Sequence, residues 1–251
     1  MKPVSKACSV KSNQKVFYLQ IDQVASCCKA HADQIDNNRN VESYIAQWQH
    51  ERQLLADGIE LPGCQVCWRD EHQGLTSYRQ QLVDYDSNTI ELYISNLCNH
   101  MCSYCSPKYS SVWQQSIQDQ GMFTHISQSA KTNLITNQSA VDTTRWLDQI
   151  ASYIQTCADN SVSLRLLGGE PLMQQRNLQT LLALNSNKIK TLALHTNLNP
   201  PNNKFLTWIL DHINTDKLKI TISIDATPDY NHVPRAGFDQ LRFQTNLEQL
   251  Q

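Results

Sequence analysis

The chain has 251 residues, of which 40% are hydrophobic and 18% charged, and its formal net charge is −2. This length allows one or two domains with a buried core. The lack of excess basic charge argues against nucleic acid or an anionic membrane surface as a partner. No apolar run approaches the roughly 20 residues needed to cross a bilayer, and no apolar signal core follows the first lysines. We therefore expect a cytoplasmic protein that binds neither membrane nor nucleic acid.

Residues 1–87 are rich in cysteine and show little strand periodicity. A strand is expected over residues 16–21, and helical spacing follows Asn40 until Gly58 ends it. The chain has nine cysteines in all, and eight of them precede residue 106. Disulfides are disfavoured in the cytoplasm, so clustered cysteines there indicate metal binding. The ninth, Cys157, falls on the apolar face of a predicted helix, where a small buried residue is expected.

Residues 88–251 alternate strand-like and helical patterns, which predicts βαβ units and a parallel sheet. Residues 121–140 are polar and predict a long loop. The predicted strands are Ile90–Ser95, Val162–Leu167, Ile189–Leu194 and Leu218–Ile224. The predicted helices are Val141–Cys157, Leu172–Leu184, Lys204–Ile213 and Phe238–Leu250.

The strongest motif is a Cys-x3-Cys-x2-Cys segment, Cys98, Cys102 and Cys105, three residues beyond the first of these four strands. Three thiolates on one loop can ligate three irons of a cubane cluster and leave the fourth iron open to a substrate or cofactor. Zinc is the alternative. Structural zinc normally has four ligands, and His100, inside the first spacing, suits a tetrahedron poorly.

This motif resembles the radical S-adenosylmethionine (SAM) enzymes, and three further segments resemble that family in the expected order. Each lies at the carboxyl end of a predicted strand, which is the face that carries chemistry in barrel-like α/β folds. The resemblance implies an oxidoreductase or transferase with a (β/α) barrel. The segments are Gly168-Gly169-Glu170-Pro171, as in the family's GGEP; Thr196-Asn197, with Leu198 in place of the family's Gly; and Ser223-Ile224-Asp225-Ala226, as in Ser-Ile-Asp-Gly.

The resemblance also implies roles for individual residues. Cys98, Cys102 and Cys105 would hold a [4Fe-4S] cluster whose open iron is chelated by SAM. Reductive cleavage of SAM would then give a 5′-deoxyadenosyl radical that abstracts a hydrogen atom. Tyr104 would lie near the adenine or serve as a packing aromatic. Glu170 would accept a hydrogen bond from the ammonium of SAM.

Further contacts with SAM or substrate follow from the same resemblance. Asn197 is an expected contact or a turn residue, and Arg235 is an expected carboxylate contact or a surface residue. The backbone at two glycines would approach a ligand closely. These glycines and the remaining expected contacts are Gly168, Gly169, Ser223 and Asp225.

A second resemblance covers residues 64–79, whose pattern is Cys-x2-Cys-Trp-x2-Glu-x2-Gly-x2-Ser-x-Arg. It is similar to radical SAM proteins with a twitch domain, which implies an auxiliary [4Fe-4S] cluster. Glu71 and Arg79 are expected to form an ion pair on a helix surface. Taken alone, the first two cysteines also fit a thiol redox motif or half a zinc site, so a non-catalytic zinc-binding protein is the alternative function. The implied ligands are Cys64 and Cys67 together with Cys8 and one of Cys27 and Cys28, the other being spare.

We therefore expect a twitch-like region over residues 1–87 and a radical SAM core over residues 88–251. The family's barrel usually has six βα units, and about four are present here. Either the chain is a fragment of a longer protein, or a partner or the N-terminal region covers the open sheet edge. The resemblance implies a reductase or a flavodoxin- or ferredoxin-type electron donor, and a peptide or small-molecule substrate.

Overall fold

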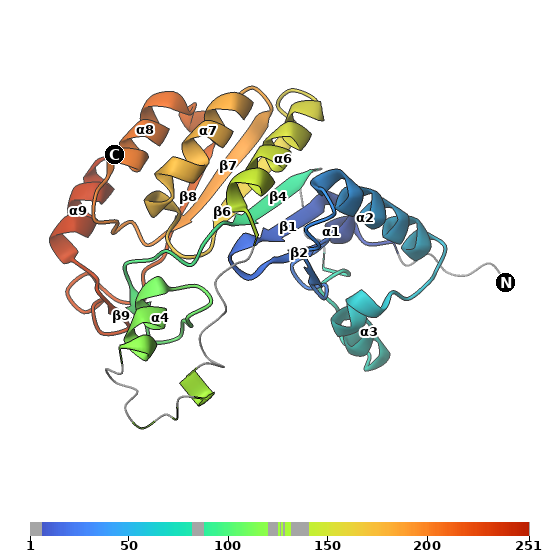
Figure 1. Cartoon of the computed structure of the whole chain (residues 1–251), viewed down its shortest axis with the longest axis horizontal. Helices are drawn as coiled ribbons and strands as arrows, with labels where there is room; N and C mark the ends of the chain where they lie inside the picture. The colour runs from blue at the N-terminus through green and yellow to red at the C-terminus, as the bar shows by residue number, and fades with distance from the viewer. Residues whose placement is uncertain are drawn as a thin grey trace.

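The structure is a computed structural model that describes residues 7–81, 88–119, 125, 127, 129–131 and 141–250. A seven-stranded sheet with the order β3-β2-β1-β4-β6-β7-β8 forms its centre (Figure 1). Strands β1, β4, β6, β7 and β8 pair in parallel, and β2 and β3 continue the sheet antiparallel to β1. These strands are β1 (Gln14–Tyr18), β2 (Gln23–Ala25), β3 (Asp33–Gln34), β4 (Thr89–Tyr93), β6 (Val162–Leu167), β7 (Ile189–Thr196) and β8 (Leu218–Ile222). A separate antiparallel pair is formed by β5 (Met101–Cys102) and β9 (Arg235–Ala236).

Three of the helices, α6, α7 and α8, lie against one face of the parallel strands (Figure 1). None of the described helices is both long and apolar enough to span a membrane. The helices are α1 (Ser9–Asn13), α2 (Val41–Ala56), α3 (Gln65–His72), α4 (Ser111–Gln118), α6 (Thr143–Thr156), α7 (Gln175–Asn185), α8 (Lys204–His212) and α9 (Gln240–Glu248). Short 3-10 turns occur at Leu19–Ile21, Pro62–Cys64, Pro171–Met173 and Thr215–Lys217.

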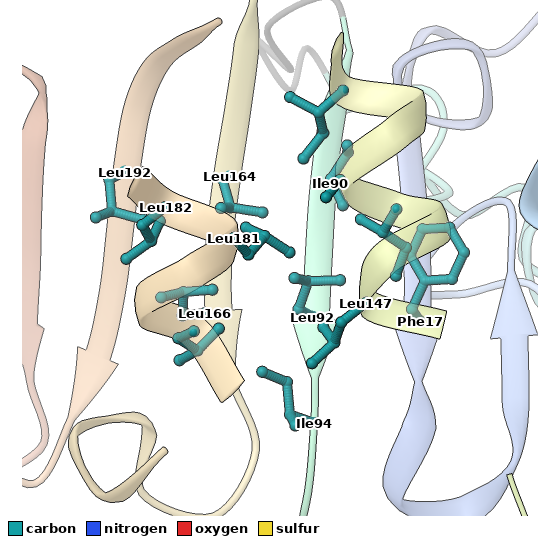
Figure 2. Packing of buried hydrophobic residues seen from close by; sticks show 14 of the residues in the cluster. Phe17, Ile90, Leu92, Ile94, Leu147, Leu164, Leu166, Leu181, Leu182 and Leu192 are labelled. Atoms are coloured by element: carbon teal, nitrogen blue, oxygen red, sulfur yellow. The ribbon is translucent and has the colours of Figure 1, made fainter. Parts of the chain in front are cut away.

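The main core lies between the sheet and these helices (Figure 2). Because side chains alternate along a strand, Ile90, Leu92 and Ile94 all turn toward the helices. Each such fully buried aliphatic side chain stabilises the fold by about 1.5–3 kcal/mol. Glu91 and Tyr93 alternate with these residues along β4, so their side chains point to the other face of the sheet. The labelled partners from other elements are Phe17, Leu147, Leu164, Leu166, Leu181, Leu182 and Leu192.

The predicted mixed α/β architecture is confirmed in its coarse form. The four predicted strands correspond to β4, β6, β7 and β8, and the sheet is mostly parallel. A fifth parallel strand, β1, overlaps the strand predicted over residues 16–21 only at residues 16–18, because Leu19–Ile21 forms a 3-10 turn. The barrel itself is not confirmed, because the described sheet is open with β3 and β8 at its edges.

The predicted helices are found with shifted ends. Asp142 caps α6, its Oδ1 accepting a hydrogen bond from the backbone N–H of Arg145 at 3.1 Å. Helix α7 begins three residues later than predicted, because Pro171 starts a 3-10 turn instead. Most of the predicted loop over residues 121–140 lies outside the described residues.

The sheet continues across the predicted boundary at residue 88. Strand β1 pairs with β4 in parallel register, and α2 contacts α6. Residues 7–81 therefore share the sheet and also hold a small apolar cluster of their own. The division into two functional regions stays a prediction.

Candidate functional site

The three cysteines of the predicted cluster motif lie on the loop that follows β4. Residues of β5 pair with β9, and the backbone N–H of Ser103 donates to the Pro234 carbonyl at 2.8 Å. On the other side, the backbone N–H of Cys98 donates to the Ser111 hydroxyl at 3.1 Å, just where α4 begins. The cysteine loop is therefore held between α4 and the segment that follows β8.

Two glycines allow this loop to lie directly on its neighbours. Gly169 has φ of +47°, and a Cβ there would lie closer than 3.0 Å to the backbone oxygens of Leu97 and Ser95. Gly237 has φ of +99°, and a Cβ there would lie 2.5 Å from the Asn99 carbonyl oxygen. Both positions need a residue without a side chain. The GGEP-like segment and the β9 turn thus support the cysteine loop from two sides.

The Glu170 carboxylate is 1% exposed and joins the ends of β6 and β7. It accepts hydrogen bonds from the Thr196 hydroxyl at 2.6 Å, the Asn197 backbone N–H at 2.7 Å and the Leu172 backbone N–H at 3.0 Å. Burial raises the pKa of Glu170, and these donors oppose that rise. Its predicted contact with the ammonium of SAM stays a prediction, since here its oxygens bind the protein itself.

Asn197 connects this buried carboxylate to the cysteine loop. Its Nδ2 donates to Asn99 Oδ1 at 3.0 Å, and its Oδ1 accepts from the Asn199 backbone N–H at 2.8 Å. Asn199 Oδ1 in turn lies 3.3 Å from His100 Nε2, and burial lowers the pKa of His100 to about 4. This polar network includes Asn99 and Asn199, which the sequence did not single out. Their positions were the available signal, since Asn99 lies inside the cysteine motif and Asn199 lies two residues after Asn197.

Three residues predicted to bind SAM or substrate lie together beside Cys102. Asp225 Oδ2 accepts a hydrogen bond from the Tyr104 hydroxyl at 2.7 Å and lies 2.7 Å from Arg235 Nε. Arg235 Nη1 lies 3.8 Å from the Cys102 sulfur. Burial raises the pKa of the Asp225 carboxyl, but the Tyr104 hydroxyl and the Arg235 guanidinium outweigh this and lower it. Arg235 is buried, so its alternative as a surface residue is wrong.

The other predicted contacts are at the same end of the sheet. The Ser223 backbone N–H donates to the Thr196 carbonyl at 2.8 Å, which places it beside the Glu170 network. Gly168 packs against Tyr93, with φ of +78°. Leu198, which stands where the family has Gly, is fully buried and takes φ of +53°.

The three thiols influence one another and are partly buried. Burial raises the pKa of Cys98 to about 12 and also raises the pKa values of Cys102 and Cys105. The charges of Cys102 and Cys105 act on Cys98, so the three sulfurs are within electrostatic reach of one another. The backbone N–H of His100 lies 3.5 Å from the Cys98 sulfur and points at it. Metal binding would have to displace the thiol protons.

The cysteines of the N-terminal region are brought together around a second site. Four of them line one cavity of about 20 Å³, together with Trp68, Tyr78 and Arg79. At this volume, a cubane cluster needs the four thiols to rotate apart about their Cα–Cβ bonds. The four lining cysteines are Cys8, Cys27, Cys64 and Cys67.

Backbone N–H groups point at three of these four sulfurs. Lys11 donates to the Cys8 sulfur and Lys29 to the Cys27 sulfur, both at 3.4 Å. The backbone N–H of Arg79 bonds to Cys67, where it opposes the rise in pKa that burial causes. Hydrogen bonds of this kind stabilise anionic sulfur and tune iron–sulfur clusters. The donor set therefore fits a group held by thiolates.

Cys28 faces different partners from Cys27. Its sulfur lies 3.8 Å from the Tyr78 hydroxyl, and its backbone N–H donates to Gln14 Oε1 at 2.9 Å. A hydrogen bond from Cys27 lowers the pKa of Cys28 to about 6, despite the opposing effect of burial. Cys28 does not line the four-cysteine cavity.

The remaining residues of the twitch-like pattern fold against this cavity. Gly74, with φ of +73°, turns the chain after α3 so that Arg79 returns over the Trp68 ring, 4.5 Å from its centroid. Arg79 forms an ion pair with Glu71, which also accepts a hydrogen bond from the Ser77 hydroxyl at 2.5 Å. The side chains of Arg79 and Glu71 are only 14% and 15% exposed. The prediction of a helix-surface pair is therefore wrong, because the loop after α3 covers it.

Among the described residues, no group of three or more Cys, His, Asp or Glu side chains lies close enough together to hold a metal ion. The metal ligands implied by the two resemblances thus stay predictions. Cys157, expected to be buried, is half-buried, and its sulfur accepts a hydrogen bond from Asn88 Nδ2 at 3.0 Å.

No protein-family profile and no curated protein match this chain. Among solved structures it is similar to native anSMEcpe with bound AdoMet, with 16% identity and a TM-score of 0.40 over 64% of this chain and 39% of that one. It is also similar to native anSMEcpe with bound AdoMet and Cp18Cys peptide, with 17% identity and a TM-score of 0.39 over 64% and 38% of the two chains. The match thus spans about two-fifths of those chains. A likeness this weak carries no argument about function, which has to come from the site.

Proposed function

We propose that this chain is a radical SAM enzyme with a [4Fe-4S] cluster on Cys98, Cys102 and Cys105. The observation that carries the proposal is the placement of three thiols on one loop at the carboxyl end of parallel strands. That loop rests on Gly169 and Gly237, which admit no side chain. Three cysteines leave one iron of a cubane free for SAM.

When bound, the cluster and SAM supply reductive cleavage of the sulfonium and a 5′-deoxyadenosyl radical that removes a hydrogen atom from the substrate. The protein supplies charge and position. The Arg235 guanidinium beside Cys102 offsets thiolate charge, and Asp225 holds that guanidinium in place. Tyr104 is 62% exposed, so its ring remains accessible to a ligand while its hydroxyl binds Asp225.

We further propose an auxiliary cluster on Cys8, Cys27, Cys64 and Cys67, with Cys28 as the spare cysteine. A cubane spreads its irons over the corners of a cube and so holds its thiolates further apart than a zinc ion does. Around zinc, sulfurs bound at 2.3 Å in a tetrahedron stand only about 3.8 Å apart. The four cysteines line one small cavity and would have to rotate apart to hold the larger group, and N–H donors to three of the sulfurs support a thiolate-held group.

The face of the sheet opposite α6, α7 and α8 is the place we propose for a peptide or small-molecule substrate. It presents the Tyr18 and Tyr93 rings, with centroids 4.7 Å apart, and the ion pair between Arg165 and Glu91 at 3.1 Å. Aromatic and charged groups of this kind orient a ligand in a site. A flavodoxin- or ferredoxin-type donor is proposed as the source of the electron.

The direct test of the function is SAM cleavage by the anaerobically reconstituted protein. With dithionite and SAM we expect 5′-deoxyadenosine, detected by mass spectrometry. Cys102→Ala should abolish the product, and Cys157→Ala, which alters a cysteine outside both sites, should retain it. Equal product from Cys102→Ala would contradict the assignment. A colourless protein that holds zinc alone would instead favour the non-catalytic alternative.

The choice between Cys27 and Cys28 has its own test. Cys27→Ala should lower the iron content by about four per chain, since a cubane then lacks a ligand. Cys28→Ala, the matched control one residue away, should keep all its iron. The reverse result would show that Cys28 is the ligand.

A further inference from the structure

The four-cysteine cavity shares a wall with a second, open cavity of about 670 Å³. Lys11, Lys29 and Ala30 line both cavities. Of these, Lys11 is almost completely buried, with 3% of its surface exposed. A buried lysine that lines the thiol cavity needs an explanation, because burying a charge is costly unless it is compensated.

The contacts of Lys11 give it a fixed place between the two cavities. Its Nζ lies 2.6 Å from Glu51 Oε2 and 2.5 Å from the Ser26 hydroxyl. Its backbone N–H donates to the Cys8 sulfur. Glu51 is 23% exposed and lines the open cavity but not the cysteine cavity. Lys11 therefore lines both cavities, whereas its partner Glu51 lines only the open one.

Lys11 lines the same cavity as the four cysteines. A cluster ligated by four thiolates is an anion, and it becomes one unit more negative when it gains an electron. A fixed positive charge in a low-dielectric wall stabilises the more negative, reduced form. Net charge near a cluster is one of the properties that set its reduction potential.

We propose that Lys11 raises the reduction potential of a cluster in the four-cysteine cavity and that Glu51 opposes this effect. The inference rests on the proposed auxiliary cluster. In the redox step the cluster takes up one electron from an external reductant, with no bond made or broken and no proton moved. Lys11 acts through its charge alone and is not one of the cluster's ligands.

The test is a redox titration with dithionite, followed by electron paramagnetic resonance. It uses the full chain with Cys98, Cys102 and Cys105 changed to Ala, so that only the cavity cluster contributes to the signal. Lys11→Met, which keeps the length of the side chain without its charge, should shift the midpoint potential to a more negative value. Glu51→Gln should shift it to a more positive value.

Lys15→Met is the matched control, because Lys15 is also buried but lines neither cavity. Its potential should stay close to that of the unsubstituted protein. If the midpoint potentials of Lys11→Met and Glu51→Gln shift in the same direction, or if neither shifts, the inference is overturned. The proposed function still stands in that case, provided that the protein binds iron. If Lys11→Met does not fold, the direction of the Glu51→Gln shift decides by itself. Absence of iron from the unsubstituted protein would overturn both proposals.

Discussion

Gly169→Ala tests whether the cysteine loop rests on the GGEP-like segment as closely as the geometry requires. Two costs add at this position. A side chain at φ of +47° costs about 1–2 kcal/mol, since left-handed backbone is unfavourable for residues with a Cβ. The added Cβ also meets the backbone oxygens of Leu97 and Ser95, and overpacking of this kind costs about 1–3 kcal/mol more. We expect a total loss of about 2–5 kcal/mol in the free energy of unfolding.

Two other glycines separate these costs. Gly74 has φ of +73° with no atom near its Cβ position, so Gly74→Ala should lose only about 1–2 kcal/mol. Gly63 has neither a positive φ nor a close neighbour, so Gly63→Ala should be neutral or gain about 0.5 kcal/mol. Urea unfolding of the three variants gives the comparison. A loss in Gly169→Ala no larger than that in Gly74→Ala would refute the close packing of the loop.

Three further substitutions test other parts of the structure. Arg79→Met should lower the free energy of unfolding in urea by about 3 kcal/mol, because the largely buried Glu71 carboxylate then lacks its ion-pair partner. A loss below about 1 kcal/mol would mean that the ion pair is dispensable. Leu198→Gly relieves a strained φ, a gain of about 1 kcal/mol, but removes a fully buried side chain, a loss of about 3 kcal/mol. The free energy of unfolding should therefore fall by about 2 kcal/mol, and a variant more stable than the parent would contradict this balance. Burial, followed by repulsion from Arg52, lowers the pKa of Lys15 from 10.5 to about 8, so the folded state binds this proton less tightly than the unfolded state does. The unfolding free energy of the parent protein should therefore rise relative to Lys15→Met by up to about 3 kcal/mol between pH 8 and 10.5, and a constant difference would exclude the shift.

The sequence predicted the parallel sheet because its strands carry apolar runs that helices must cover. It also predicted which segments meet at one end of the sheet, since parallel strands place their carboxyl ends together. Asp225 and Arg235 come from a segment more than 100 residues after Tyr104 and still lie beside Cys102. Their mutual contacts could not be predicted, because they depend on side-chain conformations that only packing fixes.

The N-terminal region was harder to predict. β1 is short, and its parallel pairing with β4 joins segments more than 70 residues apart, which no local pattern encodes. The burial of Glu71 and Arg79 depends on the turn at Gly74, which returns the chain over Trp68. Lys11 gave no signal at all, because a lysine three residues after a cysteine is ordinarily a solvated residue.

The iron content after anaerobic reconstitution tests the central claim most directly. We predict about eight irons per chain in the unsubstituted protein and about four in the variant with Cys98, Cys102 and Cys105 changed to Ala. About four should also remain when Cys64 and Cys67 are changed to Ala, and SAM should then perturb the paramagnetic resonance spectrum of the remaining cluster. A protein that binds zinc in place of iron, or a triple variant that keeps all its iron, would contradict the account.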